Sequence, residues 1–313
     1  MDACLVTGGA GFIGSHLADE LVRRGARVRV LDNFLTGRRE NIAHLRDTIE
    51  LFEGDIRDAA ACREAMRGMA VVFHMAALPS VPRSVVDPIT TNEINIRGTL
   101  NLLSAAAEAK TRRFIFASSS SCYGDDPGLP KVEGVEGRPL SPYAVTKWAG
   151  EKYLQTFAQL HGLSTVSLRY FNVFGPRQDP ASQYAAAVPL FITRILRGEP
   201  PTIFGDGEQS RDFTYISNVV EANLLAAEAP GLAGDVFNIA CGERITVNVL
   251  AARINAILGS AVVPKYAPPR PGDILHSFAA IDRARGRLKF APAVSFDEGL
   301  KITVQWYKER TNP

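Results

Sequence analysis

The sequence predicts an α/β protein whose doubly wound parallel sheet carries helices on both faces and is followed by a smaller carboxyl-terminal region. Three observations predict this fold. Short β-rich runs alternate with helical patterns in the first half, a glycine-rich turn joins the first such pair, and prolines cluster after about residue 171. Strands that alternate with helices imply right-handed crossovers, and such crossovers build a parallel sheet covered on both faces.

The individual elements follow from the spacing of the apolar residues. A stripe of Ile13, Leu17 and Leu21 predicts a first helix, which ends at Gly25. Further helices are expected over 58–67, 91–109 and 142–160. The expected strands are 3–7, 27–31, 51–56, 71–75, 114–117 and 165–169. We expect residues 1–170 to form the sheet domain, with returns to it from within 212–240, and residues 171–313 to form mainly the second region.

Composition and charge exclude several classes of protein. Of the 313 residues, 46% are hydrophobic and 22% are charged, as in an ordinary globular protein. The net charge of +2 offers no basic surface to a phosphate backbone, so we expect no nucleic-acid partner. We find no run of 18 apolar residues and no secretory leader, and therefore expect no membrane association and a cytoplasmic location. The four cysteines and five histidines lack metal-binding spacings, so no metal site is predicted.

The turn between the first strand and the first helix has the pattern of a dinucleotide site. Residues 7–14 read TGGAGFIG, which sets Gly8, Gly11 and Gly14 three residues apart. Glycines let the backbone approach a pyrophosphate, and the first N–H groups of the helix lie at the positive end of its dipole. The strand before the motif and the helix after it are the context that such a site needs. The sequence therefore predicts a Rossmann domain over residues 1–170.

An acidic residue at the end of the second strand indicates which dinucleotide is bound. A carboxylate at Asp32 accepts hydrogen bonds from the adenosine ribose hydroxyls. It also repels a 2′-phosphate, which favours NAD over NADP. Arg38 and Arg39 lie nearby, however, and a basic residue can receive that phosphate. After the third strand, Asp55 and Ile56 suit the adenine amino group and ring face.

Residues 141–147, which read SPYAVTK, carry the expected chemistry. Ser141 is a plausible helix N-cap and Pro142 suits the first helical position. Tyr143 and Lys147 then lie on one helix face, because they are four residues apart. A tyrosine acts as a base near pH 7 only if its pKa falls by about three units, which is about 4 kcal/mol. A lysine cation at ~4 Å can supply about that much before desolvation is counted.

Four consecutive serines follow the strand expected at 114–117. At the carboxyl end of a parallel strand, the hydroxyls of residues 118–121 point into the ligand crevice. One of them can hydrogen-bond the reacting oxygen. No serine stands in a GxSxG turn, so hydrolase chemistry has no support.

With these motifs the sequence resembles the extended short-chain dehydrogenase/reductase superfamily, and within it the UDP-sugar 4-epimerases. The resemblance covers essentially the whole chain. Its motifs are TGGAGFIGSH (7–16), LDNF (31–34), GDIRD (54–58), HMAA (74–77), INIRGT (94–99), FASSSSCYG (116–124), SPYAVTK (141–147), LRYFNVFGPRQ (168–178), RDFTYI (211–216) and RPGD (270–273).

The resemblance implies an isomerase that keeps NAD bound and inverts C4 of a UDP-hexose through a 4-keto sugar. Tyr143 is then the base at the sugar 4-hydroxyl, Lys147 holds the nicotinamide ribose, and Ser119 is the helper hydroxyl with Ser120 as the second choice. Asn95 is expected close to the catalytic helix on the cofactor side. The implied cofactor contacts are Gly8, Gly11, Phe12, Ile13, Gly14, Asp32, Asn33, Asp55, Ile56, Ala76, Asn95, Tyr143 and Lys147.

The resemblance also implies a UDP-sugar-binding region, mainly over 171–313. Its arginines suit a diphosphate, because a guanidinium binds phosphate with two parallel hydrogen bonds. The expected residues are Asn172, Arg211, Arg270 and Asp273 at the diphosphate and uridine, Phe204 near the uracil, and Arg83 and Ser277 at the sugar.

The identity of the sugar depends on few residues. Ser277 falls where some family members carry a bulky tyrosine, and a small residue leaves room for a 2-acetamido group. The stretches 124–133 and 80–84 also look like bacterial UDP-GlcNAc 4-epimerases. We therefore favour the UDP-GlcNAc/UDP-GalNAc pair. UDP-glucose/UDP-galactose remains an alternative, as does UDP-glucuronate, whose carboxylate Arg83 could bind.

Two further alternatives concern the class of protein. Sugar 4,6-dehydratases and decarboxylases carry carboxylates where this chain has Ser120 and Ser121, so epimerisation is favoured. A non-catalytic NAD-sensing module would not need the intact Tyr143–Lys147 pair.

A homodimer is expected by the same resemblance. The helices expected at 91–109 and 142–160 carry apolar residues that could pair across it, although these could also pack on the sheet. They are Leu100, Leu103, Leu154 and Phe157.

Overall fold

The computed structural model describes residues 2–180, 186–269 and 274–311. Its centre is a seven-stranded sheet in the order β11-β6-β5-β4-β1-β2-β3, in which every neighbouring pair is parallel. The strands are β1 (Cys4–Thr7), β2 (Val28–Asp32), β3 (Ile49–Glu53), β4 (Val71–His74), β5 (Arg113–Ser119), β6 (Thr165–Tyr170) and β11 (Asp235–Ile239). The predicted doubly wound fold is confirmed.

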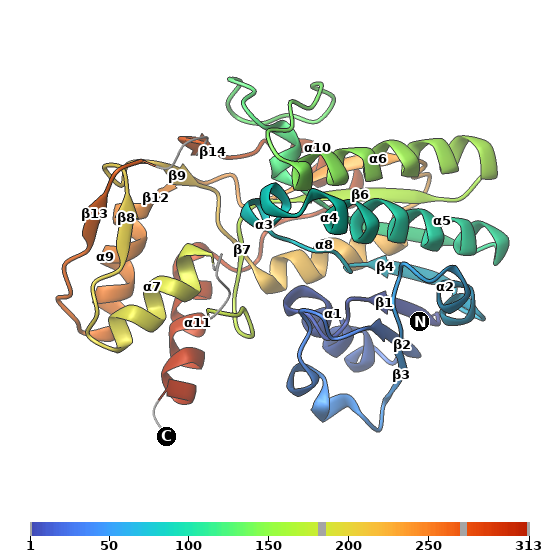
Figure 1. Ribbon diagram of the computed structural model, residues 1–313, viewed down its shortest axis with the longest axis horizontal. Helices are drawn as coiled ribbons and strands as arrows, with labels where there is room; N and C mark the ends of the chain where they lie inside the picture. The colour runs from blue at the N-terminus through green and yellow to red at the C-terminus, as the bar shows by residue number, and fades with distance from the viewer. Residues whose placement is uncertain (1, 181–185, 270–273, 312–313) are drawn as a thin grey trace.

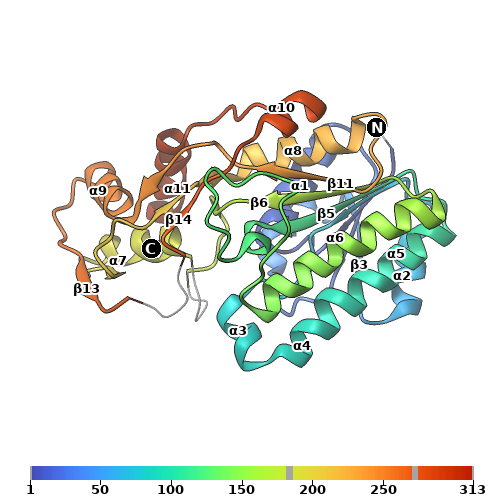
Figure 2. The same ribbon diagram turned by 90° about the horizontal axis from the view of Figure 1, so that it is seen from above.

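Helices cover both faces of this sheet (Figures 1 and 2). On one face lie α2 (Ala59–Met66), α5 (Gly98–Glu108) and α6 (Pro142–His161), with the short α3 (Val81–Val86) and α4 (Pro88–Asn92) beside the start of α6. The other face carries α1 (Phe12–Arg23), α8 (Ile216–Glu228) and α10 (Asp282–Leu288).

Alternation along the strands divides the core between the two faces. In β1, Leu5 packs with the cluster under α5 and α6, whereas Cys4 and Val6 pack with the cluster under α1 and α8. This is the two-residue period that a strand imposes on its side chains. The α1 and α8 cluster continues into the carboxyl-terminal region through Phe191 and Leu300, so the two regions share one core.

The smaller region lies at one end of the sheet, at the left of both views. Its helices are α7 (Ala187–Leu196), α9 (Val247–Leu258) and α11 (Phe296–Thr311). Short strands accompany them: β8 (Thr202–Phe204) with β13 (Lys265–Ala267), and β9 (Ser210–Arg211) between β12 (Ile245–Thr246) and β14 (His276–Ser277). A further pair joins β7 (Val173–Phe174) to β10 (Thr214–Tyr215).

Two expected elements differ from the structure. The third strand is Ile49–Glu53 rather than 51–56, because it is an edge strand whose mostly exposed residues hide its start. The helix expected over 91–109 is α4 to residue 92, then a π-helical turn, η3 (Glu93–Arg97), and only then α5. Such turns insert one residue per turn and often occur at functional sites.

The apolar stripes considered for a dimer are largely internal. Leu103 and Leu154 are fully buried in the cluster between the sheet and its helices, and Phe157 packs against that cluster. Leu100 is partly buried. These side chains pack on the sheet because α5 and α6 turn their apolar faces to it, so Leu103 and Leu154 cannot form an interface with a second copy.

Candidate functional site

The turn after β1 packs so tightly against its surroundings that Gly8 and Gly14 leave no room for a side chain. A Cβ at Gly14 would lie 2.2 Å from the Gly8 carbonyl oxygen, and one at Gly8 would lie 2.7 Å from the Ala76 Cα. Gly8 also has a φ of +66°, which favours glycine. Gly11 is the N-cap of α1 and supplies no side-chain cap. The first N–H groups of α1, at Phe12 and Ile13, therefore have no side-chain cap, which is the arrangement that suits a pyrophosphate.

Asp32 stands at the end of β2 against this turn. Its carboxylate accepts hydrogen bonds from the backbone N–H of Ala10 at 2.9 Å and of Phe34 at 2.8 Å. Burial raises its pKa. Each carboxylate oxygen has a second lone pair, so the group can still accept ribose hydroxyls. The two backbone N–H groups fix the orientation of the carboxylate.

The basic residues beside Asp32 have acidic partners. Arg38 pairs with Asp179 at 2.8 Å, and Arg39 pairs with Glu53 at 2.7 Å. Both arginines are thus paired with carboxylates in the protein, which is compatible with NAD as the cofactor.

The residues expected at the adenine lie together beyond Asp32. The Asn33 amide donates to the Asp55 carboxylate at 2.9 Å, and Arg57 also binds that carboxylate and lowers its pKa to about 2. Ile56 is 7% exposed, with Gly98 packed against its side chain.

A buried histidine, which sequence reasoning did not single out, links the end of β1, just before the glycine turn, to helix α5. His74 Nδ1 is 2.7 Å from Thr7 Oγ1, and its Nε2 is 2.9 Å from Thr99 Oγ1. Thr7 Oγ1 in turn accepts from the Ala76 N–H at 3.2 Å. The motif HMAA marked this histidine, but its partners are distant in sequence. His74 thus positions the turns that follow β1 and β4.

We expect His74 to make the protein less stable in acid. Burial and the nearby Lys147 lower the pKa of His74 to about 3 from its ordinary 6.5. Between these values the unfolded chain binds more protons than the folded one, so stability is lost as the pH falls from about 6.5. This contribution is about 1.4 kcal/mol per pH unit. Urea unfolding at pH 5 and pH 7 should show a smaller pH-dependent loss in His74→Gln than in the unchanged protein, and equal losses would contradict the assignment.

Tyr143, Lys147 and Ser119 come together at the carboxyl end of β5. The Ser119 hydroxyl is close enough to the Tyr143 phenol to lower its pKa. Ser121 Oγ donates to Ser119 Oγ at 2.9 Å, which leaves the proton of Ser119 free for the phenol oxygen. Lys147 Nζ donates to the Ala117 carbonyl at 2.7 Å and lies 5.9 Å from the centre of the Tyr143 ring. Ser119, rather than the second choice Ser120, makes the contact with the phenol.

The expected low pKa of Tyr143 is not present in the protein alone. Burial raises the pKa of Tyr143 to about 12, although the Ser119 hydrogen bond opposes this, and burial lowers the pKa of Lys147 to about 8. The gain expected from the lysine was counted before desolvation, and burial is the largest effect on the phenol in the protein alone. Lowering the tyrosine pKa therefore needs further positive charge at the site, which an oxidised nicotinamide ring carries.

The start of α6 is held by neighbours on the cofactor side. Asn95, in the π-helical turn, donates from Nδ2 to Thr146 Oγ1 at 3.0 Å, and its Oδ1 accepts from the Leu78 N–H. Ser84 Oγ, which sequence reasoning missed, accepts from the Tyr143 N–H at 3.0 Å. Asn95 thus lies between the loop after β4 and the helix that carries Tyr143.

Five of the seven residues expected to bind the substrate lie within the described parts of the chain. Ser277 in β14 pairs in register with Arg211 in β9. Arg211 donates to the Leu275 carbonyl, and the Asn172 amide donates to the Asp212 carbonyl at 3.1 Å. Phe204 ends β8, and Arg83 lies half-buried in α3 next to Ser84. Arg270 and Asp273 lie outside the described residues.

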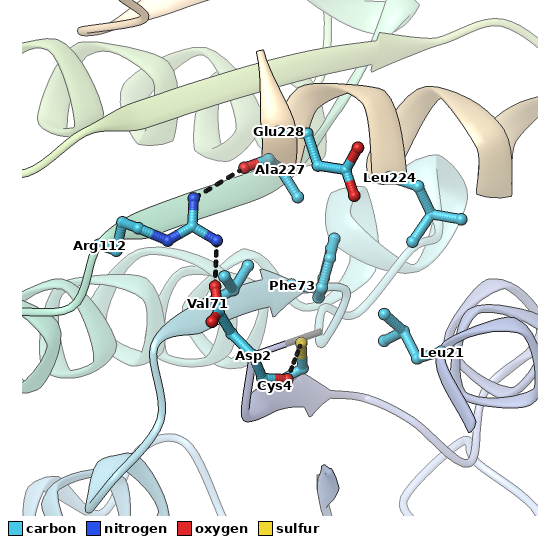
Figure 3. A pocket seen from close by; sticks show the side chains of 9 residues that line it. All are labelled: Asp2, Cys4, Leu21, Val71, Phe73, Arg112, Leu224, Ala227 and Glu228. Carbon is cyan, nitrogen blue, oxygen red and sulfur yellow. Dashed lines mark hydrogen bonds and ion pairs between the residues drawn. The ribbon is translucent and has the colours of Figure 1, made fainter. Parts of the chain in front are cut away.

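A separate cavity of about 220 Å³ lies at the opposite, amino-terminal end of β1 and β4 (Figure 3). Cys4, Leu21 and Phe73 are among its apolar lining, and Arg112 bridges Asp2 and the Ala227 carbonyl at its rim. Because the glycine turn follows the carboxyl end of β1, this cavity is not part of the cofactor crevice.

Two absences concern only the chain that the structure covers. Within residues 2–180, 186–269 and 274–311, no three His, Cys, Asp or Glu side chains are grouped to hold a metal. No helix in those same ranges is long and apolar enough to cross a membrane.

Known proteins match this chain over nearly its whole length. A solved UDP-N-acetylglucosamine 4-epimerase from Methanobrevibacter ruminantium, in complex with UDP-N-acetylmuramic acid, is 42% identical with a TM-score of 0.95 and covers 99% of each chain. A Thermotoga maritima UDP-glucose 4-epimerase with UDP-glucose is 41% identical with a TM-score of 0.94, over 99% of this chain and 100% of the other. A Thermus thermophilus UDP-glucose 4-epimerase in complex with NAD is 39% identical with a TM-score of 0.89, over 98% and 99%.

The family comparison agrees with these structures. The model of the NAD dependent epimerase/dehydratase family matches residues 4–240. The expected enzyme class, the resemblance to the UDP-sugar 4-epimerases and the expected cofactor are thereby confirmed. The chain belongs to the NAD dependent epimerase/dehydratase family.

Proposed function

We propose that the protein inverts C4 of UDP-GlcNAc and UDP-GalNAc, with NAD held at the glycine turn. The observation that carries the chemistry is the contact of Ser119 with Tyr143, one helical turn from Lys147. Ser119 is the last residue of β5, at the carboxyl edge of the sheet where the glycine turn follows β1. The proposal for the sugar rests on the small side chain of Ser277 and on the 42% identity to a UDP-N-acetylglucosamine 4-epimerase.

The side chains have distinct tasks in this reaction. The Tyr143 phenolate takes the proton of the sugar 4-hydroxyl, and Ser119 donates a hydrogen bond to the reacting oxygens. Lys147 holds the cofactor ribose and adds positive charge. NAD bound at the glycine turn would supply the acceptor and donor of the C4 hydride. A general base of this kind typically contributes about 10²–10⁴-fold to the rate.

Inversion requires the 4-keto sugar to turn over between the two hydride transfers. The nucleotide must stay bound during that rotation, so the site needs firm contacts to the diphosphate and weaker ones to the sugar. We propose five contacts to the nucleotide: Asn172, Phe204, Arg211, Arg270 and Asp273. A guanidinium suits this task because it pairs with phosphate through two hydrogen bonds.

Elimination or decarboxylation is less favoured by the serine tract. Those reactions use a carboxylate after the helper hydroxyl, whereas Ser120 and Ser121 occupy these positions. Ser121 is engaged with Ser119 and offers no acidic group. UDP-glucuronate epimerisation stays the alternative for which Arg83 supplies a carboxylate-binding group.

The sugar is tested by giving UDP-GlcNAc, UDP-glucose and UDP-glucuronate separately to the purified protein and recording proton NMR spectra of the products. We expect a galacto-configured product from UDP-GlcNAc. Substituting Ser277→Tyr should lower kcat/KM for UDP-GlcNAc by at least about tenfold, because a ring fills the space for the acetamido group, and should largely spare UDP-glucose. If UDP-glucose or UDP-glucuronate is converted and UDP-GlcNAc is not, the acetamido assignment is wrong.

We also propose that the protein is a homodimer in the cytoplasm. Exposed apolar side chains on α3, α4 and α6 support an interface there; they are Val85, Val86, Ile89, Val145 and Leu160. The four cysteines are free thiols, as in a reducing compartment. Sedimentation equilibrium should give twice the chain mass of 33.9 kDa, and a monomer mass would contradict the dimer.

A further inference from the structure

Helix α6, which carries Tyr143, contacts the end of β5 through three of its side chains. Tyr143, Lys147 and Glu151 are four residues apart on one face of α6. Tyr143 contacts Ser119, Lys147 contacts the Ala117 carbonyl at 2.7 Å, and Glu151 Oε1 accepts from Ser118 Oγ at 2.5 Å. Three successive residues of the strand are therefore bound by three successive turns of the helix.

The carboxyl group of Glu151 is buried, and its ionic partner comes from the neighbouring strand. Arg169 in β6 donates to it from Nε at 2.8 Å and from Nη2 at 2.7 Å. Glu151 is 1% exposed, and Arg169 is 4% exposed. Ser118 and Arg169 are paired in register, so both side chains reach the same face of the sheet.

The other groups around this pair are uncharged. The guanidinium of Arg169 lies 4.5 Å from the centre of the Tyr123 ring, and Ser118 Oγ is 3.7 Å from Cys122 Sγ. Burial raises the pKa of both the Cys122 thiol and the Tyr123 phenol to about 12. Neither group competes with Arg169 for the carboxylate.

We propose that Glu151 is a positioning residue, which holds Ser118 and thereby sets the Ser119 hydroxyl against Tyr143. The inference rests on the proposed function for its catalytic meaning. Ser118 and Ser119 are the last two residues of β5, where the ladder to β6 ends. Lys147 fixes this strand only at Ala117. The bond from Ser118 to Glu151 adds a constraint one residue before the helper serine, whose own Oγ also accepts hydrogen bonds from Ser121.

A carboxylate suits this task better than a neutral acceptor. Hydrogen bonds to an ionised acceptor are shorter and stronger than neutral ones. One oxygen of Glu151 accepts from both Ser118 and Arg169, which an amide oxygen does less well. Arg169 supplies two of these hydrogen bonds from its guanidinium, where the pair is shielded from water.

Ser118→Ala tests the link because it leaves the Glu151–Arg169 pair in place. We expect kcat for the epimerised UDP-sugar to fall about tenfold, with KM and the NAD content of the purified protein unchanged. The acidic limb of the kcat profile should move to higher pH by about one unit, since a phenolate that loses a hydrogen bond has a higher pKa. Ser167→Ala is the matched control. Ser167 in β6 is as buried as Ser118 and lies on the same face of the sheet, so its substitution should change none of these values.

A direct titration separates this inference from the proposed function. The pKa of Tyr143 is read from tyrosinate absorbance of the NAD-loaded protein, as the difference from Tyr143→Phe in the same background. A higher value in Ser118→Ala than in Ser167→Ala supports the inference even if no UDP-sugar is converted. Equal kcat and equal pKa in the two variants would overturn it.

A second variant covers the case in which Ser118→Ala does not fold. Glu151→Gln keeps the shape of the side chain and one acceptor oxygen but cannot bind Ser118 and both Arg169 nitrogens as well. It should show the same fall in kcat and the same rise in the Tyr143 pKa. A Glu151→Gln protein with an unchanged Tyr143 pKa would rule out the positioning role.

Discussion

Substituting Tyr143→Phe is expected to lower kcat about 10³-fold while leaving the bound NAD in place. The change removes only the hydroxyl oxygen that takes the proton, and general acid–base catalysis of this kind contributes about 10²–10⁴-fold. The glycine turn and Asp32, our proposed dinucleotide contacts, are untouched. Turnover of UDP-GlcNAc by NMR and NAD content by absorbance after denaturation measure the two effects.

Tyr153→Phe is the matched control for this experiment. Tyr153 lies on the same helix, is 37% exposed and is not part of the serine-tract contacts, so its loss should change neither quantity. A non-catalytic NAD-sensing module would be indifferent to both substitutions. Full activity in Tyr143→Phe would remove Tyr143 from the role of base.

Gly14→Ala is expected to yield a protein that retains no NAD. A Cβ at this position meets the Gly8 carbonyl oxygen at 2.2 Å and the Gly9 Cα at 2.8 Å, and both contacts are with backbone. The turn must open to relieve them, and it then no longer presents the N–H groups of α1 to a pyrophosphate. We expect loss of the bound dinucleotide, no epimerisation even with added NAD, and a lower thermal midpoint.

The control uses a glycine that has space around it. Gly286 lies inside α10, and a Cβ added there would meet nothing within 4 Å, so Gly286→Ala should keep NAD and activity. Alanine favours a helix by up to about 1 kcal/mol over glycine, so its thermal midpoint should be equal or higher. If Gly14→Ala purifies with a full complement of NAD, the glycine turn is not the dinucleotide site.

Local spacing explains why much of the site could be predicted. The turn glycines are contiguous with the first strand and helix, and Tyr143 and Lys147 are one helical turn apart, so no tertiary information was needed. Alternation and length placed six of the seven sheet strands, although β3 was shifted. The edge position of β3 left its residues exposed and removed the apolar signal on which the prediction depended.

The parts that were missed depend on contacts between distant segments. His74 and Glu151 act through Thr7, Thr99, Ser118 and Arg169, which other strands and helices supply. The four-residue interval from Lys147 to Glu151 was visible in the sequence. Nothing in the sequence showed that a buried arginine, Arg169, would pair with the Glu151 carboxyl group. The raised pKa of Tyr143 in the protein alone comes from burial, which depends on the whole fold.

The same balance explains why the cofactor matters to the proposed base. With a pKa of about 12, Tyr143 is protonated at neutral pH in the protein alone. Burial lowers the pKa of Lys147 to about 8, and its ammonium group is mostly charged below that value. A second positive charge at the nicotinamide position would favour the phenolate, so base and hydride acceptor are expected to become active together.

The most direct test of the account is epimerisation of UDP-GlcNAc in D₂O, followed by proton NMR of the product. If Tyr143 moves only the hydroxyl proton and the hydride of C4 returns to C4, the UDP-GalNAc formed keeps an ordinary proton at that carbon. Deuterium at C4 would show that this hydrogen exchanges with solvent. That result, or the absence of any C4-inverted product from all three UDP-sugars, would contradict the account.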